Sequence, residues 1–100
     1  MKLIDNHADT AKYSSGDIPA GRYMIEMDGA TATTAVVSVF RRARGAAATN
    51  DFPAASGGVA VTLTKTDSAK EILVGSGQIV VSRATGGDAI SVDLTRIPLS

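Results

Sequence analysis

Apolar and polar residues alternate with a period of two along several short stretches of the chain. In residues 21–28 the alternate positions Tyr23, Ile25 and Met27 are apolar, whereas most of the positions between them are charged. Residues 59–65 and 89–97 show the same alternation. Because successive side chains of a β-strand point to opposite sides, this pattern is typical of half-buried strands. The three stretches are therefore predicted as strands with one side in a core.

Three other stretches are predicted as strands on different grounds. Residues 33–42 are β-branched or apolar on both sides, which is typical of a strand covered on both faces. Residues 71–74 and 78–83 are short and rich in Val and Ile, although Asp67 favours a one-turn helix as the alternative for the first of them. Residues 43–58, rich in Ala and Gly, are predicted as a long connection whose role the sequence does not assign.

Two parts of the chain repeat the same order of signals. Residues 21–41 and 77–96 each consist of a glycine, a strand, a glycine-containing turn, a second strand and an arginine. The turns fall at Asp28-Gly29 and Gly86-Gly87, which are typical of tight hairpin connections. The repeat predicts two similar hairpins on related positions of one fold, unless the likeness is only what any two hairpins share.

Many short strands, closely spaced turns and no helical periodicity predict an all-β fold. We expect a small antiparallel β-sandwich or jelly-roll-like domain, with a small barrel as the alternative. Residues 20–100 are expected to form this domain and residues 1–19, which are largely polar, an extended N-terminal arm. Leu3 and Ile4 form the one apolar pair near the start, and they favour either a short edge strand or an anchor on a neighbouring subunit.

Composition narrows the classes of function. The 100 residues are 44% hydrophobic but only 4% aromatic, which predicts a thin core between two sheets or a core completed by partner subunits. Ten basic and ten acidic residues give no net charge, which argues against nucleic-acid binding and permits dense assembly. The absence of cysteine excludes disulfides and thiolate metal sites. Neither a signal peptide nor a membrane-spanning run is present, so we expect a product made and kept in the cytoplasm, or built into something assembled there.

Catalytic chemistry has little support in the residues. His7 is the single histidine, and Asp5 and Asp9 would share its side of a strand, which makes a metal site conceivable. Such sites normally use more nitrogen or sulfur ligands, so a solvated polar segment is the favoured interpretation. No serine lies in a Gly-x-Ser-x-Gly elbow. We therefore expect no enzyme, no cofactor and no metal.

An interface with a partner protein is the better-supported expectation. Several apolar residues fall on the predicted outer side of their strands, and a basic cluster at residues 41–45 runs from the end of the predicted strand into the long connection. The cluster suits either acidic patches of a partner or phosphates, unless it only keeps a loop soluble. A symmetric homo-oligomer is expected. The candidate interface residues are Leu3, Ile4, Tyr13, Met24, Val36, Phe40, Arg41, Arg42, Arg44 and Val80.

The order of these motifs resembles that of short structural proteins of tailed bacteriophages. The resemblance covers roughly residues 19–97 and lies in Pro19-Ala20-Gly21-Arg22-Tyr23, in Gly77-Gln78-Ile79-Val80-Val81 and in the strand ending at Ile97. No single motif is diagnostic, and the long connection at 43–58 departs from the pattern.

What this resemblance implies is a capsid decoration or cement protein. It would be a virion component, assembled in the host cytoplasm, that binds the major capsid protein and stabilises the head shell. A trimer is expected, and in such proteins an extended arm commonly reaches a neighbouring subunit, a part that residues 1–19 would play. The alternatives are a tail or head–tail adaptor component and, from another class, a carbohydrate- or receptor-binding module. Two Tyr and two Phe are a poor supply of aromatic platforms for a sugar site.

Overall fold

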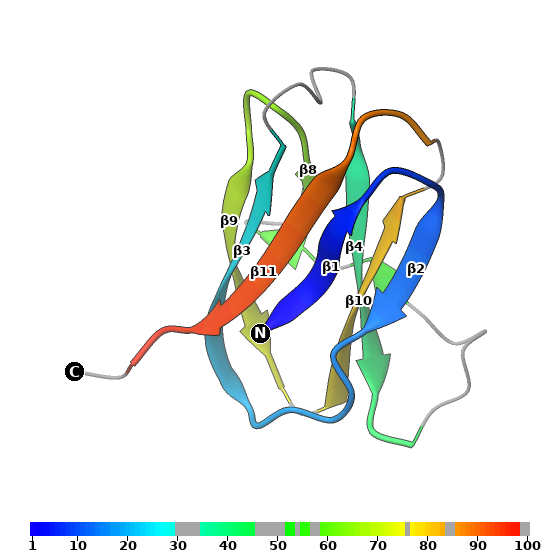
Figure 1. The fold of residues 1–100 in the computed structure, drawn as a ribbon. Coiled ribbons are helices and arrows are strands. Elements are labelled where there is room, and N and C mark those ends of the chain that lie inside the picture. The colour runs from blue at the N-terminus through cyan, green and yellow to red at the C-terminus, as the bar shows by residue number, and fades with distance from the viewer. Residues whose placement is uncertain are drawn as a thin grey trace.

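The computed structural model consists of β-strands throughout its described part, which comprises residues 1–29, 35–45, 52–53, 55–56, 59–75, 77–83 and 86–98. Two antiparallel sheets lie one behind the other (Figure 1). No helix in these residues is long and apolar enough to cross a membrane. The predicted all-β sandwich is confirmed.

Each sheet is built from strands that are distant in the chain. In sheet A the order is β1 (Lys2–His7), β11 (Ile90–Arg96), β3 (Gly21–Asp28) and β9 (Ala69–Val74). In sheet B it is β2 (Ala11–Ser14), β10 (Gly77–Arg83) and β4 (Val37–Ala43), with both β5 (Phe52–Pro53) and β8 (Thr62–Leu63) pairing with β4. A separate two-stranded pair joins β6 (Ala55–Ser56) to β7 (Val59–Ala60).

The pairing is nested, and this nesting defines the fold. The strand β1 pairs with β11, β2 with β10, β3 with β9 and β4 with β8, so the first half of the chain lies against the second half. The paired halves then fold over, because β11 also pairs with β3 and β10 with β4. This strand order is that of a jelly roll, the double-sheet architecture made of two Greek keys.

The two predicted hairpins are wrong, and the core explains why. β3, which ends at Asp28, belongs to sheet A and the next strand β4 belongs to sheet B, while β10, which ends at Arg83, belongs to sheet B and the next strand β11 to sheet A. The apolar sides of β3 and β4 both face the same interior, so the two strands lie across the core from each other. The repeated segments pair with one another instead, with Ile25 opposite Leu94 and Val39 opposite Val81.

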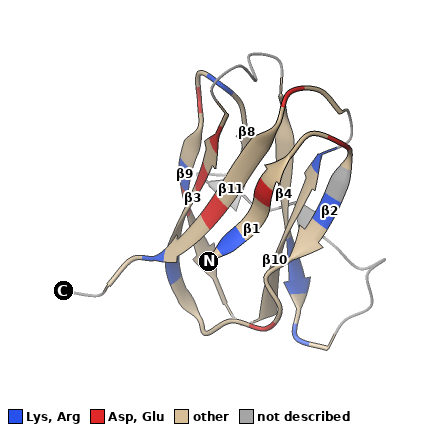
Figure 2. Ribbon diagram, in the orientation of Figure 1, with Lys and Arg blue, Asp and Glu red and all other residues tan. Residues whose placement is uncertain are grey.

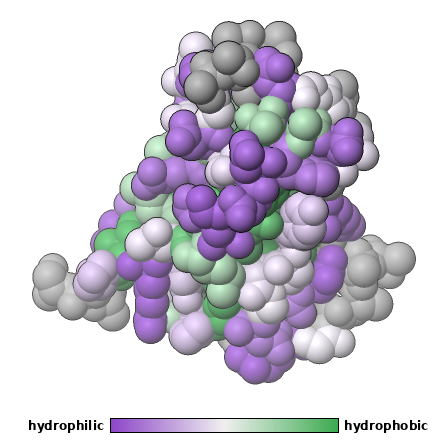
Figure 3. Space-filling view, viewed as in Figure 1, coloured by the Kyte–Doolittle hydropathy of each residue, from purple (hydrophilic) through white to green (hydrophobic). Residues whose placement is uncertain are grey.

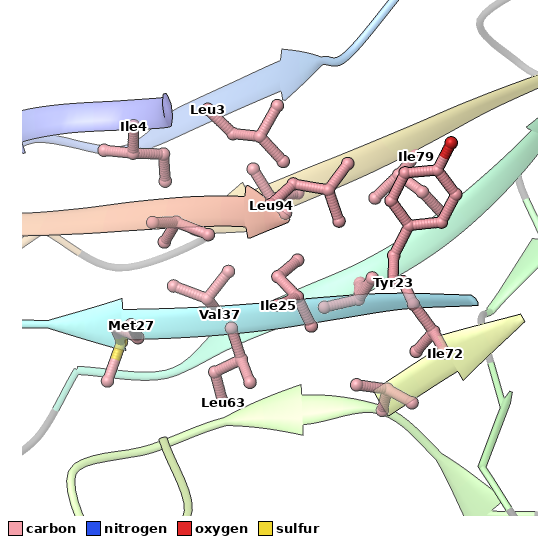
Figure 4. Close-up of a cluster of buried hydrophobic side chains, with 14 of the residues drawn as sticks. Leu3, Ile4, Tyr23, Ile25, Met27, Val37, Leu63, Ile72, Ile79 and Leu94 are labelled. Carbon is pink, nitrogen blue, oxygen red and sulfur yellow. The ribbon is translucent and has the colours of Figure 1, made fainter. Parts of the chain in front are cut away.

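Aliphatic side chains from both sheets fill the space between the layers (Figure 4). Tyr23, Ile25 and Met27 are buried, as their alternation predicts. In β4 the prediction of burial on both sides is wrong. Val37 and Val39 are buried, but Phe40 on the other side is only partly covered, because no third layer packs there among the described residues.

Residues 1–19 form the edges of the sandwich. Of the two alternatives for Leu3 and Ile4, the structure has the edge strand: both side chains are buried in the core, with Ile4 only 1% exposed (Figure 4). The backbone N–H of Leu94 donates to the carbonyl oxygen of Met1 at 2.7 Å, and the amino group of Met1 donates to the carbonyl oxygen of Leu94 at 2.8 Å. The strand β2 in turn completes the edge of sheet B.

The segments from 43 to 74 differ from expectation in detail. The strand expected over residues 59–65 is divided into β7 and β8, which pair with different partners. The helix alternative after Asp67 is wrong, because residues 69–74 pair with β3 at every position from Ala69 to Val74. Parts of the predicted connection at 43–58 and the start of the strand predicted at 33–42 lie outside the described residues.

Candidate protein-binding surface

The two outer faces of the sandwich carry different kinds of side chains. Face A, the outward side of sheet A, includes Lys2, Asp5, Arg22, Met24, Glu26, Asp28, Ala69, Glu71, Leu73, Ser91, Asp93 and Thr95. Face B, the outward side of sheet B, includes Lys12, Ser14, Ser38, Phe40, Arg42, Thr62, Gln78, Val80 and Ser82. Among the described residues face A holds five acidic and two basic side chains, and face B holds two basic side chains and no acidic one.

An apolar pair lies at the centre of face B. Phe40 of β4 and Val80 of β10 are directly opposite each other, and Ser14 of β2 flanks Val80 on its other side. Val80 is only 1% exposed although it does not belong to the core cluster, so it is covered on its outer side as well. Phe40 is partly exposed. Apart from the two basic residues at its margins, face B surrounds this pair with uncharged polar side chains.

Polar contacts hold the neighbours of this pair in place. The hydroxyl of Ser14 donates to the side-chain carbonyl oxygen of Gln78, and the amide nitrogen of Gln78 lies 3.5 Å from a carboxylate oxygen of Asp17. The hydroxyl of Ser15 accepts the backbone N–H of Ile79 at 3.0 Å. These contacts join the edge strand β2 to the central strand β10, and so they fix one flank of face B.

The three arginines of the basic cluster at 41–44, which begins at the end of the predicted strand, do not share one surface. Arg42 is opposite Gln78 and lies on face B. Arg41 is opposite Ile79 and so lies on the other side of the sheet, where it is exposed. Arg44 lies in the turn beyond β4, with its guanidinium 3.6 Å from the carboxylate of Asp17.

The remaining candidate interface residues are dispersed. Leu3 and Ile4 are in the core and are not accessible to a partner of the folded chain. Met24 is partly buried at the middle of face A, on the opposite side of the molecule from Phe40. Tyr13 packs edge-on against His7, with ring centroids 6.4 Å apart, at the margin where β1 and β2 meet. Val36 is 49% exposed just before β4.

The possible metal ligands Asp5, His7 and Asp9 do not form a cluster. Asn6 has a φ of 46°, in the left-handed region, and the pairing of β1 with β11 shifts register on both sides of Ile4. This backbone interrupts the alternation that would place the three side chains on one face. Within the described ranges, no three His, Asp or Glu side chains come close enough together to hold a metal ion.

Sequence reasoning missed the separation of charge between the two faces. Figure 2 shows acidic positions on β1, β3 and β11 of sheet A together with basic positions on β1, β3, β9 and β11, and basic positions on β2 and at the end of β4 in sheet B. Figure 3, in the same view, shows mainly hydrophilic side chains over the side of sheet A with smaller apolar areas between them. The sequence shows which residues of each strand are charged, but which strands contribute to the same face depends on how the strands pair in the sheets.

Comparison with known proteins gives no relative. No protein family matches the chain, and no match was found among curated proteins or among solved structures.

Proposed function

We propose that this chain is a non-enzymatic structural protein of a tailed-bacteriophage particle, where it decorates the head shell and reinforces it by binding the major capsid protein. The observation that carries the proposal is the composition of face B, which we propose as the surface that joins the chain to neighbouring subunits. The virion assignment itself rests on the sequence resemblance over residues 19–97.

Face B has the composition of an interface rather than of a solvated surface. The centres of protein interfaces are depleted of charged residues and enriched in aromatic residues and arginine. The partly exposed Phe40 supplies the accessible apolar centre, since Val80 beside it is already covered, and Arg42 lies at the margin. Solvated faces usually mix charges of both signs, as face A does with its ion pairs Lys2–Asp93 and Arg22–Glu71.

The architecture is compatible with this proposal and with one alternative. Jelly rolls are found in viral capsid proteins and in lectins, so the fold by itself does not choose between them. A sugar site normally presents several exposed aromatic rings, whereas Tyr23 is buried and Tyr13, although 42% exposed, lies alone with His7 at a sheet margin. A structural role is therefore favoured over carbohydrate binding.

The copy number of the chain in purified particles tests the virion assignment. Quantitative mass spectrometry would compare the chain with the major capsid protein. Copies in a fixed ratio of the same order as the capsid protein are expected for decoration. A few copies per particle would overturn decoration and favour the tail or the head–tail adaptor. Absence from the particle would overturn the virion proposal altogether.

The role of face B is tested by a matched pair of substitutions. We expect Phe40→Ser to weaken binding to particles that lack the chain by at least about tenfold, since it removes the apolar centre of the contact. The control is Leu73→Ser on face A, where the side chain is 67% exposed and its loss should leave both folding and binding unchanged. Binding would be measured by co-sedimentation, and equal effects of the two substitutions would contradict the assignment of face B.

A further inference from the structure

The edges of the two sheets are not equally protected against the addition of a further strand. An edge strand exposes backbone donors and acceptors to other chains, and bulges, charges or short length normally block their pairing. The edge strand β1 has two register shifts and a left-handed residue, Asn6. The edge strand β2 has four residues, one of them Lys12, and β5 and β8 have two residues each. These edges therefore carry recognised forms of protection.

The edge strand β9 is different. It pairs with β3 at every position from Ala69 to Val74 without a bulge, and it lies at the outer margin of sheet A (Figure 1). No described strand pairs with its other side, and β6, which lies close to β9, pairs with β7 instead. Leu73 of β9 is 67% exposed, more than any other large hydrophobic residue in the described ranges.

The hydrogen bonds to β3 determine which backbone groups of β9 remain at its open side. The backbone N–H of Met27 donates to the carbonyl oxygen of Ser68 at 2.7 Å, immediately before β9 begins. Backbone groups of an antiparallel strand point alternately to one side and the other. Ser68 and every second residue after it, such as Ile72, therefore direct their N–H and C=O groups to β3. Glu71 and Leu73 direct theirs to the open side.

We propose that β9 pairs antiparallel with β9 of a second copy of this chain, around a two-fold axis at Leu73. In this register Leu73 lies opposite its own copy, Ile72 opposite Val74, and Glu71 opposite Gly75. The pairing adds about six backbone hydrogen bonds and joins the two A sheets into one. A Cβ added at Gly75 would have nothing within 4 Å, so the end of this edge has room for a partner.

The residues of β9 exclude the other two-fold registers. An axis at Lys70 or at Glu71 would place two like charges directly opposite each other, which destabilises a sheet. An axis at Ile72 would place Lys70 of each copy opposite Val74 of the other, on the apolar side of the strand. The axis at Leu73 leaves Lys70 outside the paired segment, and so it is the register without an unfavourable pair.

A second copy is the partner that fits this edge. The open side of β9 is complementary to itself, because two identical strand edges can pair antiparallel without any other sequence. The exposed side chain of Leu73 then finds its apolar neighbour in the same residue of the partner. Such a contact is isologous and closes at two molecules, so a dimer is expected and no larger assembly.

The small size of the contact sets its expected strength. Five residues on each strand span about 17 Å, and the area they bury is well below the roughly 800 Å² per partner of a standard interface. We therefore expect a dissociation constant of roughly 0.1–1 mM. Salt should have little effect on it, because backbone hydrogen bonds and an apolar pair form the contact.

Introduced cysteines test the register directly, since the chain has no cysteine of its own. Opposite residues of a hydrogen-bonded antiparallel pair have Cα atoms about 5.5 Å apart, which a disulfide can span. Leu73→Cys should therefore form a disulfide-linked dimer under mild oxidation. Glu71→Cys alone should not, because the two copies of residue 71 are about 14 Å apart along the strands. A mixture of Glu71→Cys and Gly75→Cys should give the mixed dimer.

Sedimentation velocity up to millimolar concentration tests the association itself. The unmodified chain should show a reversible equilibrium between monomer and dimer. Leu73→Lys should weaken it by at least about tenfold, because it places two lysines opposite each other. Thr95→Lys makes the same change of charge at an exposed position of β11 and should leave association unchanged. Circular dichroism would confirm folding. Leu73→Pro is the second variant, since it removes an N–H that β3 does not use.

Four results would overturn the proposal. They are a chain that stays monomeric at millimolar concentration, growth beyond a dimer, equal crosslinking of Leu73→Cys and Glu71→Cys, and equal weakening by Leu73→Lys and Thr95→Lys. The proposal goes beyond the binding role of face B and does not depend on the virion assignment. At the micromolar concentrations of co-sedimentation the chain is monomeric, so Leu73→Ser remains a control for face B and the two proposals can fail separately.

Discussion

At the scale of single residues, the backbone conformation and surroundings of residue 77 require a glycine. Its φ is 131°, and a Cβ built there would lie 2.4 Å from the carbonyl oxygen of Arg42 and 2.9 Å from the backbone nitrogen of Arg44. Both contacts are with backbone of the paired strand, which cannot move without disturbing the pairing of β4 with β10. The close approach therefore places Arg42 and the end of face B.

We expect Gly77→Ala to destabilise the protein by more than about 2 kcal/mol, because it adds a steric clash to an unfavourable backbone conformation. Gly45→Ala is the matched control, since Gly45 also has a positive φ of 74° but nothing within 4 Å of the added carbon. Its cost should be about 1 kcal/mol from backbone strain alone. Urea unfolding of both variants measures the difference, and equal costs would mean that the close approach to Arg42 is absent.

The sequence predicts much at this scale. Which residues of a strand face the interior follows from alternation, because one-sided burial leaves an apolar residue at every second position. Tyr23, Ile25 and Met27 are buried as predicted, and so are Val61 and Leu63. Val80 is an exception, because it lies on the outward side of β10 and is still almost fully covered. The alternation of residues within β10 does not indicate this burial.

At the scale of strands, β1 is the element whose role changed most between sequence and structure. The sequence of this largely polar segment, with its one apolar pair, is compatible both with a strand in its own sheet and with an anchor on a neighbouring subunit. The structure seats it in its own sheet, with Ile4 opposite Val92. Arg83 reinforces this edge, because its guanidinium donates to the backbone carbonyl oxygen of His7 at 3.1 Å and so links β10 of sheet B to the end of β1 in sheet A.

The seating of β1 predicts the effect of truncating Ile4. We expect Ile4→Ala to lower the free energy of unfolding by about 2–4 kcal/mol, because it leaves a cavity in the core. Val36→Ala should change it by less than about 0.5 kcal/mol, since Val36 is half exposed outside the strands. Chemical denaturation of dilute protein provides the measurement. A small effect of Ile4→Ala would indicate that the segment docks elsewhere in solution.

Local sequence signals do not determine which strands pair with each other. The glycines after β3 and β10 indicate that the chain turns, but not whether the next strand lies beside the previous one or across the core. The choice depends on contacts between residues that are far apart in the chain, such as Ile25 with Leu94. The composition of faces A and B follows from that choice, and so the candidate surface could be predicted only in part.

At the scale of the whole molecule, nested pairing makes almost every strand contact non-local. The outermost pair joins residues 2–7 to residues 90–93, and the next joins residues 11–14 to residues 80–83. A folding nucleus must therefore close long loops before much apolar surface is buried. The net stability of such a fold is gained late, when the sheets close on each other.

We expect refolding to be slow for a chain of this size, on the order of milliseconds to seconds, because folding rates fall as contacts become less local. Stopped-flow dilution from urea, followed by tyrosine fluorescence, measures the rate, since Tyr23 becomes buried on folding. Refolding within microseconds would contradict the nested pairing.

The pairing of β1 with β11 affects how the nascent chain folds during translation. Val92 is translated 88 residues after Ile4, its partner in the sheet. At about 5–20 residues per second, the ribosome needs roughly 4–18 s to cover that distance. Throughout that interval the apolar side chains of β1 cannot be buried in their native position. β11 must therefore be made before β1 can pair in its sheet, and a ribosome that stalls before β11 leaves β1 unpaired and accessible to chaperones and proteases.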